Sequence, residues 1–270
     1  MLLRSALLLC FSALAVVAQD VREFPGRVVA LTRADVSNAV ESTVAEIHFQ
    51  PGQRVAKGDL LFTLDTTDFE QDLANAQAKL LHAETALLNA EEDYRRLRTL
   101  EERGSATGVQ LLKAEVAQGF ANAVRSETRA KVAEAQANLE RTRIHAPLSG
   151  IISASSVNVG TYIKKGRAPL AHIVQLDPVR IAYQVPYVQR IEELNLQHLK
   201  FPENLLSQTE LSLKISDDWV YRLTTVPSQI DAEVDPETGL ITIWADIGNP
   251  DAQLRPGMSV TVVSRPRMNR

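Results

Sequence analysis

Apolar residues recur every seven positions, in alternating steps of four and three, along a segment that begins near residue 66. Nine consecutive positions fit this pattern: Phe69, Leu73, Ala76, Leu80, Ala83, Leu87, Ala90, Tyr94 and Leu97. Charged residues lie between them, as expected for a coiled-coil helix whose other faces are in solvent. The pattern therefore predicts a long helix over residues 66–103.

A second helical segment, residues 107–143, has a weaker apolar pattern made mostly of small residues. Its expected contact face consists of Val109, Leu112, Val116, Gly119, Ala123, Ala130, Ala133 and Ala137. Between the two segments, Gly104 suits a left-handed helix C-cap, and Thr107 with Gln110 forms a capping box. We therefore expect an antiparallel α-helical hairpin over residues 66–143, which at ~1.5 Å per residue is roughly 55 Å long.

Two similar seven-residue motifs flank this hairpin. They are Gly52–Gly58 (GQRVAKG) before it and Gly160–Gly166 (GTYIKKG) after it. Each copy leads into a short apolar strand and a turn, so each reads as half of a small β-sandwich. Neither half can bury its apolar face alone. We therefore expect residues 31–65 and 144–176 to close against each other, which forces the residues between them to leave and return as a rod.

Short segments with alternating polar and apolar residues follow residue 177. Their period of two predicts β-strands, and turn phrases separate some of them at residues 235–239 and 249–251. The expected strands cover residues 179–185, 211–215, 219–224, 240–247 and 259–263. This pattern predicts a small antiparallel β-barrel over residues 177–264, followed by a tail at residues 265–270.

Two further features belong to the predicted barrel. Residues 186–199 are expected to form a short helix that lies across it. Trp219 and Trp244 are interpreted as core or barrel-end residues rather than as a ligand cage.

The N-terminus has the pattern of an export signal. Residues 1–18 contain one basic residue, Arg4, then a largely apolar run and small residues that end at Ala18. We interpret them as a signal peptide, which is removed or else kept as a short anchor, and residues 19–30 as a separate N-terminal strand. Cys10 is the single cysteine of the chain and lies within the apolar run, so disulfides and thiol chemistry are not expected in the exported protein.

Charge and residue composition favour a protein without catalysis. The net charge is −4, and acidic and basic residues are interspersed, so no basic patch indicates nucleic-acid binding. The five histidines have no ligand spacing, and Met258 with Met268 cannot form a thioether cluster for a soft metal. Neither a phosphate-binding glycine loop nor a nucleophile elbow is found. We therefore predict no enzyme activity, no cofactor and no metal.

The repeated turns resemble those of lipoyl and biotinyl carrier domains, with Ile163 in place of Val in the second copy. In those carriers a tight hairpin joins the halves and presents one lysine for acylation, whereas here the helical insertion replaces that junction. Lys57 and Lys165 are interpreted as solvated turn residues. The fold implied is elongated α+β: a split lipoyl-like β-sandwich with an inserted antiparallel coiled-coil hairpin, followed by a small antiparallel β-barrel.

Four further phrases make the chain resemble the periplasmic adaptor subunits, or HlyD-like membrane fusion proteins, of resistance-nodulation-division (RND) tripartite efflux pumps. They are Ala146–Ile152, Gln175–Val179, Val234–Gly239 and Leu254–Met258. The resemblance covers residues 24–264. It implies a periplasmic adaptor associated with the inner membrane, which links a proton-driven RND-type transporter to an outer-membrane channel of the TolC type and exports drugs or other small molecules. It also implies a ring, as a trimer of dimers or a hexamer.

In this family the hairpin tip docks on the outer-membrane channel through an Arg-x3-Leu-x6-Ser pattern. The matching positions here are Arg96, Leu100 and Thr107, with Thr in place of Ser. The resemblance therefore implies that these three residues bind the channel. Taken singly, each also has a structural interpretation: a surface charge, a seam residue and a helix cap.

The chain departs from the family pattern at its end. Family members usually continue past the barrel into a membrane-proximal β-domain, whereas this sequence ends at Arg270, and residues 22–29 are interpreted as a vestigial strand of that domain. Two other functions stay open at this point. One is a lipoyl- or biotinyl-type carrier, and the other is an adaptor for an ATP-driven exporter or a type I secretion system.

Overall fold

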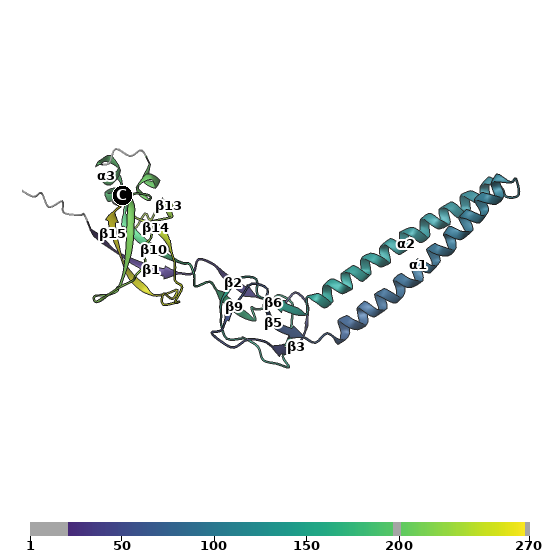
Figure 1. Cartoon of the computed structure of the whole chain (residues 1–270), viewed down its shortest axis with the longest axis horizontal. Coiled ribbons are helices and arrows are strands. Elements are labelled where there is room, and N and C mark those ends of the chain that lie inside the picture. Colours follow the sequence, from purple (N-terminus) through teal and green to yellow (C-terminus); the bar gives the residue numbers. More distant parts are fainter. Residues whose placement is uncertain (1–20, 197–200, 268–270) are drawn as a thin grey trace, which may run out of the picture. The chain divides into compact units, whose positions relative to one another are not determined.

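The computed structural model describes residues 21–196 and 201–267, so the predicted signal peptide lies outside the described residues. The described chain divides into two compact units (Figure 1). One unit is Thr32–Gln175, and the other combines the segments that precede and follow it. Each unit is built around its own hydrophobic core.

Eight short strands form the sandwich of the first unit. They are β2 (Arg33–Val36), β3 (Ser42–Ile47), β4 (Arg54–Val55), β5 (Leu60–Leu64), β6 (Arg143–His145), β7 (Gly150–Ile152), β8 (Tyr162–Ile163) and β9 (Ala171–Val174). They pair as two four-stranded sheets, in the orders β2-β9-β7-β4 and β6-β5-β3-β8. Each sheet contains strands from both halves of the sequence, which confirms that the halves close as one folded unit.

The two sheets share a single apolar core. The largest fully buried side chains in it are Leu61, Phe62, Leu64, Ile152 and Ile173. Phe62 also packs edge-on against Phe49, with ring centroids 5.3 Å apart. Because these residues come from both halves, neither half retains its buried apolar area without the other.

Both repeated turns require glycine for their backbone conformation. Gly52 and Gly58 have φ angles of +80° and +95°, and Gly160 and Gly166 have +84° and +64°. This left-handed region is accessible to glycine at little cost. The amide of Gly58 also donates to the carbonyl of Ala146, at 2.9 Å, in the other half of the sandwich. The turns therefore join the halves as well as reversing the chain.

The insertion is a hairpin of two helices, α1 (Thr67–Glu102) and α2 (Gly108–Glu140), which lie side by side and extend from the sandwich (Figure 1). At ~1.5 Å per residue, the 36 residues of α1 span about 54 Å. Asp65 precedes the N-cap residue Thr66, and its Oδ1 accepts the backbone amide of Thr67, the first residue of α1, at 3.0 Å. Hydrogen bonds from the amide and hydroxyl of Thr67 lower the pKa of the Asp65 carboxyl.

The seam predicted for α1 is confirmed. All nine predicted positions are buried or half-buried, whereas almost all of the intervening positions are exposed. Ala83 and Leu87, at the middle of the series, are the most buried of the nine positions. Large apolar side chains at strict heptad spacing were therefore sufficient to define this face.

The seam predicted for α2 is wrong. All eight positions expected to face α1 are exposed, including Val109 and Val116 at 64% each. The residues that pack on α1 are instead buried or half-buried at heptad spacing: Leu111, Ala114, Gln118, Ala121, Arg125, Thr128, Val132, Ala135 and Leu139. The reason is that α2 carries two stripes at heptad spacing, and the less apolar one faces the partner helix.

The turn between the helices has the predicted caps. Gly104 adopts a φ of +72° after the last residue of α1. Thr107 accepts the backbone amide of Gln110 on its hydroxyl at 3.3 Å, and the Gln110 side chain accepts the amide of Thr107 at 2.8 Å. These reciprocal bonds complete the capping box and satisfy two amides that the helix cannot pair internally.

The second unit is a seven-stranded antiparallel sheet in the order β12-β11-β15-β1-β10-β14-β13. Its strands are β1 (Arg22–Val29), β10 (Val179–Pro186), β11 (Thr209–Ser216), β12 (Trp219–Val220), β13 (Gln229–Val234), β14 (Leu240–Ile247) and β15 (Ser259–Pro266). The chain between β12 and β13 closes this sheet. Thr225 donates its amide to Leu211, and Ser228 donates its amide to Trp244, so the sheet curls into the predicted barrel.

The structure corrects two details of this unit and confirms the expected short helix. The strand expected at residues 219–224 is regular only at Trp219–Val220, where Trp219 is 43% exposed. The expected helix at 186–199 is described as α3 (Tyr187–Leu196), with a 3-10 turn, η1, at Pro202–Leu205. The segment interpreted as a vestigial membrane-proximal strand is β1, which pairs with β10 on one side and β15 on the other. It belongs to the barrel because Val28 is completely buried in the barrel core.

We expect Gly150→Ala to destabilise the sandwich. A Cβ at this position would lie 2.4 Å from the carbonyl oxygen of Val174, which belongs to the paired strand β9 and cannot move away freely. The free energy of unfolding should fall by ~1–3 kcal/mol, measured by chemical denaturation followed by circular dichroism. Gly119→Ala is the matched control, because nothing lies within 4 Å of its Cβ site and Ala stabilises a helix interior by about 1 kcal/mol. Equal effects of the two substitutions would contradict the packing described here.

Thr107→Ala is expected to loosen the tip of the hairpin. It removes the hydroxyl that accepts the Gln110 amide, and loss of such a cap costs ~1 kcal/mol. Amide hydrogen exchange over residues 108–112 should accelerate in this variant. Thr107→Ser retains the hydroxyl and should exchange like the unmodified chain. If all three proteins exchange alike, the capping box does not hold the turn.

Candidate partner-binding surfaces

The three residues predicted to dock on a channel lie close to the hairpin turn. Arg96 and Leu100 are one helical turn apart near the end of α1, and Thr107 caps α2 across the turn. Arg96 has 69% of its side chain exposed and pairs with Asp93 at 2.6 Å. Leu100 is 36% exposed. No hydrogen bond or ion pair joins one of the three to another within the described part of the chain, so the structure presents them as separate exposed groups around one end.

The arginines near the end of α1 are balanced by acids of the same helix. Arg95 pairs with Glu92 at 2.7 Å, and Arg98 pairs with Glu102 at 3.4 Å. Pairs of this kind, exposed and three or four residues apart, contribute less than about 1 kcal/mol each. A partner with better geometry can therefore displace them at small cost.

An exposed apolar stripe runs along α2, and sequence analysis did not identify it as a surface. We call it the α2 outer stripe; it consists of Val109, Leu112, Val116 and Phe120, with exposed fractions of 64%, 59%, 64% and 72%. Spacings of three and four residues place these side chains on one helix face. Three of the four had been assigned to the seam. The available signal was Phe120, a large apolar residue that the predicted seam left out.

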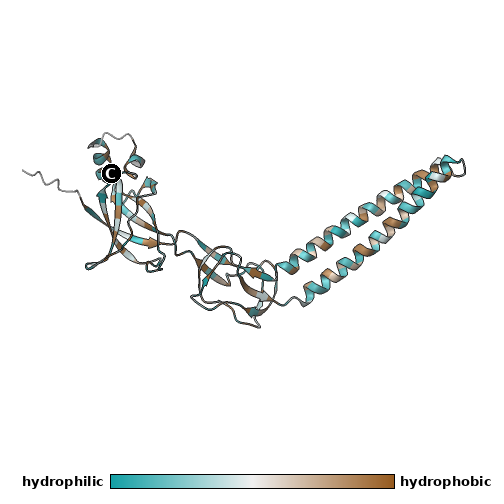
Figure 2. Cartoon of the chain, viewed as in Figure 1, coloured by the Kyte–Doolittle hydropathy of each residue, from teal (hydrophilic) through white to brown (hydrophobic). Residues whose placement is uncertain are grey.

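A second exposed stripe runs along α1. We call it the α1 flank; it consists of Ala74, Ala78, Leu81 and Leu88, all exposed, and Leu81 and Leu88 are 66% and 55% exposed. Figure 2 shows apolar segments interspersed with hydrophilic ones along both helices. Each helix of the hairpin therefore has one apolar face against its neighbour and another in solvent.

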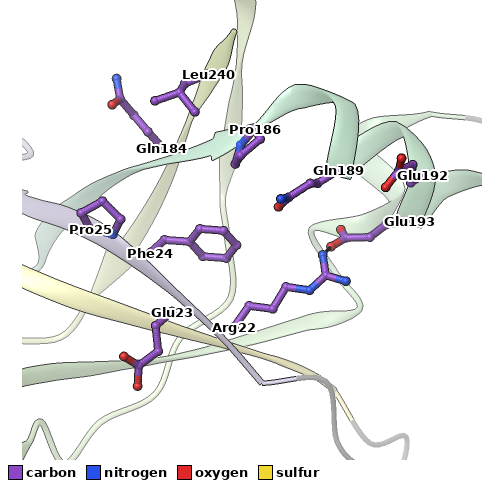
Figure 3. Close-up of a pocket in the computed structure, with 10 residues that line it drawn as sticks. All are labelled: Arg22, Glu23, Phe24, Pro25, Gln184, Pro186, Gln189, Glu192, Glu193 and Leu240. Carbon is purple, nitrogen blue, oxygen red and sulfur yellow. Dashed lines mark hydrogen bonds and ion pairs between the residues drawn. The ribbon is translucent and has the colours of Figure 1, made fainter. Parts of the chain in front are cut away.

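The barrel has a cavity of about 700 Å³ between β1, β10 and α3 (Figure 3). Phe24, Pro25, Pro186 and Leu240 supply apolar surface, and Glu23, Gln184, Gln189 and Glu192 supply polar groups. Arg22, at the start of β1, reaches across it to an ion pair with Glu193 of α3. Glu193 also accepts a hydrogen bond at 3.0 Å from Arg190, which is nearly buried.

The Glu193 carboxylate therefore bridges two guanidinium groups and holds α3 against the sheet. Tyr183 lies beneath this network, with its ring centroid 6.0 Å from that of Phe24. Burial raises the pKa of the Tyr183 hydroxyl well above its usual range, so this group stays neutral. The cavity rim is mixed in charge, and the Arg22–Glu193 ion pair connects β1 with α3 across it.

Among residues 21–196 and 201–267, no group of three or more His, Cys, Asp or Glu side chains is arranged to hold a metal ion. Lys57 and Lys165 are exposed in their turns. His172 pairs with Asp35 at 2.6 Å, and His145 contacts the carbonyl of Gly58 at 2.9 Å, so both have local structural partners. Within these same ranges, no helix has the length and apolar character needed to cross a bilayer.

The chain matches a known family over more than half of its length. The profile described as "RND MFP, barrel-sandwich hybrid domain", where MFP denotes membrane fusion protein, matches residues 32–176. These bounds coincide within one residue with the compact unit that holds the sandwich and the hairpin. "Multidrug resistance protein MdtA" of Pectobacterium atrosepticum is 29% identical over 238 residues, which cover 88% of this chain and 56% of that protein. The chain thus spans about half the length of the relatives it matches.

Solved structures share the fold. The membrane fusion protein Spr0693 from Streptococcus pneumoniae aligns with a TM-score of 0.68 and 16% identity, over 92% of this chain and all of that one. A MacA-MexA chimera that contains the Pseudomonas aeruginosa MexA α-hairpin domain aligns with a TM-score of 0.62 and 19% identity, over 92% of this chain and 80% of that one. With a split sandwich, an inserted hairpin and a barrel in this order, the chain belongs to the RND membrane fusion protein family.

Proposed function

We propose that this protein is the periplasmic adaptor of a tripartite drug efflux pump and that it acts without catalysis. The observation that carries the proposal is the closed sandwich with its long inserted hairpin, within a unit that matches the family profile. The relative named as a multidrug resistance protein supports drugs as the exported class. In this function the hairpin sets the distance between two partners, and the sandwich and the barrel hold its position.

The proposed partners are an inner-membrane transporter of the RND type and an outer-membrane channel of the TolC type. The exposed hairpin tip, with Arg96, Leu100 and Thr107, is proposed to bind the channel, and the barrel is proposed to face the transporter. Several copies assemble into a ring, because a single rod two helices wide buries too little surface to hold a conduit in place. The adaptor is exported to the periplasm by residues 1–18 and associates there with the inner membrane.

The tip contact is tested by charge reversal at matched positions. Arg96→Glu should lower efflux at least tenfold relative to the unmodified chain, because it replaces an exposed cation of the docking pattern by an anion. Efflux is measured as drug susceptibility and accumulation of a fluorescent substrate in cells that lack other adaptors and express the cognate transporter and channel. Arg98→Glu is the control, since Arg98 is also exposed and paired within α1 but lies outside the pattern. Equal loss in both variants would reject a specific role for Arg96.

Cross-linking to the channel, together with the mass of the exported protein, distinguishes an adaptor from a lipoyl- or biotinyl-type carrier. With Cys10 replaced by Ala, a cysteine at position 106 carries a cross-linker at the hairpin turn. Recovery of the channel from pump-active cells is expected. Intact mass of the exported protein should show no lipoyl or biotinyl addition at Lys57 or Lys165. The assignment would be overturned if the pump were active while position 106 formed no cross-link to the channel. A lipoyl or biotinyl group on either lysine would also overturn it.

A further inference from the structure

The barrel cavity has the size of a binding site for a small organic molecule. Its volume of about 700 Å³ lies within the range of roughly 300–1,000 Å³ that is usual for ligand pockets. Phe24, Pro25, Pro186 and Leu240 supply its apolar surface. Phe24 packs on the barrel core, with its ring centroid 6.0 Å from that of Tyr183. The cavity therefore offers a supported apolar surface to the body of a ligand.

The charges around the cavity favour a cation over an anion. Among the described residues that line it, three carry a carboxylate, namely Glu23, Glu192 and Glu193, and one carries a guanidinium, Arg22. Arg22 pairs with Glu193, whereas Glu23 and Glu192 form no ion pair within the described part of the chain. A ligand that enters this cavity meets a net negative charge, which attracts a cation and repels an anion.

Glu193 is the carboxylate that the protein holds most firmly. Its Oε2 accepts a hydrogen bond at 3.0 Å from Nη1 of Arg190, a residue that is only 5% exposed and does not line the cavity. Within the described chain, Nε and Nη2 of Arg190 are buried without a hydrogen-bond partner. A buried guanidinium depends on the anion beside it. Arg190 therefore keeps Glu193 in place whatever contacts its other oxygen.

The other oxygen of Glu193 already binds a cation from the cavity side. Nη1 of Arg22 donates to Oε1 of Glu193, and both residues line the cavity (Figure 3). Arg22 is the first residue of β1 and 33% of its side chain is exposed, so its guanidinium can turn into water. Ion pairs of such partly exposed groups contribute little to stability. The position of Arg22 thus marks where the cationic group of a ligand can bind.

We propose that the barrel cavity binds an organic cation with an apolar body, whose ammonium or amidinium group displaces Arg22 from Glu193. The apolar body lies against Phe24 and Pro186, and Gln189, which extends from α3 toward Phe24 (Figure 3), binds polar substituents. Binding exchanges the ion pair between β1 and α3 for a contact with the ligand. This site goes beyond the adaptor function, because it belongs to the barrel and requires neither a transporter nor a channel.

Three diphenyl compounds of matched shape test the charge preference. They are 3,3-diphenylpropylamine, which is a cation at neutral pH, the neutral alcohol 3,3-diphenylpropanol and the anion 3,3-diphenylpropionate. Each is titrated into the purified full chain, labelled with ¹⁵N, and followed by nuclear magnetic resonance. The amine should shift the amide signals of residues 22–25 and 184–193 and bind about tenfold tighter than the other two compounds. Equal affinity of the amine and the carboxylate, shifts confined to other residues, or no binding of the amine overturns the proposal.

Substitutions at the ion pair test the displacement of Arg22. Glu193→Gln should weaken binding of the amine about tenfold, because a charge-assisted hydrogen bond is lost. Arg22→Ala should strengthen it about threefold, because the competing cation is removed. Glu233→Gln is the matched control: it removes one carboxylate from an exposed position of β13 outside the cavity, and the amine should bind it like the unmodified chain.

Two results of this series reject the site. One is equal binding of the amine by Glu193→Gln and Glu233→Gln, which would show that Glu193 has no specific role. The other is unchanged or weaker binding by Arg22→Ala, which would show that Arg22 does not compete with the ligand. Circular dichroism of each variant verifies that the barrel is folded, and the Arg22→Ala result stands even if Glu193→Gln fails to fold.

Discussion

The closure of the two half-sandwiches is the constraint on which the rest of the first unit depends. Strand β5, which leads into α1, pairs with β6, which follows α2, so Thr63 lies opposite Arg143. The amide of Leu64 donates to the carbonyl of Thr142 at 2.9 Å, which fixes the two exits of the chain side by side. Two helices of similar length that start and finish at neighbouring points have to run out and back together. The hairpin is thus a consequence of strand pairing and core burial at its base, with the heptad seam holding the arms together beyond it.

The fold was largely predictable from sequence because its signals were redundant. Glycine at four left-handed turn positions, apolar strands after each turn and a nine-position heptad on α1 all pointed to the same arrangement. The assignment of β1 failed for the opposite reason. Residues 22–29 form an eight-residue strand that is far in sequence from its partners, and only the pairing with β10 and β15 shows that this strand completes the barrel. Sequence pattern defines a strand, but it does not define which sheet supplies the missing neighbours.

The candidate surfaces were less predictable than the fold. When a helix has one apolar stripe, that stripe is the only candidate for the face that packs within the chain. Helix α2 has two such stripes, about half a turn apart, so there are two candidates. The large side chains of Val109, Leu112 and Val116 favoured the wrong face as the intramolecular one. A hydrophobic period along a helix indicates that one face of the helix is buried against something. It does not show whether that face packs on another part of the same chain or on a different molecule. The three tip residues, in turn, came from a family resemblance, because Arg96 and Leu100 have no physical signature that distinguishes them from other surface residues of α1.

A hairpin of two helices has consequences for how its functional residues can be recognised. Each helix has one face in the seam, and every other face is in solvent, so a side chain outside the seam makes few contacts beyond its own helix. Substitution of such a residue changes stability by only a few tenths of a kcal/mol unless it alters a cap or adds Gly or Pro. A large functional loss from an exposed position on the rod therefore reports a lost partner rather than a lost fold. The same reasoning explains how a more polar seam is tolerated on α2: the base is fixed by β5 and β6 and the tip by the Thr107 capping box, so the seam has to maintain alignment between two fixed ends, and the stronger apolar face remains free for association.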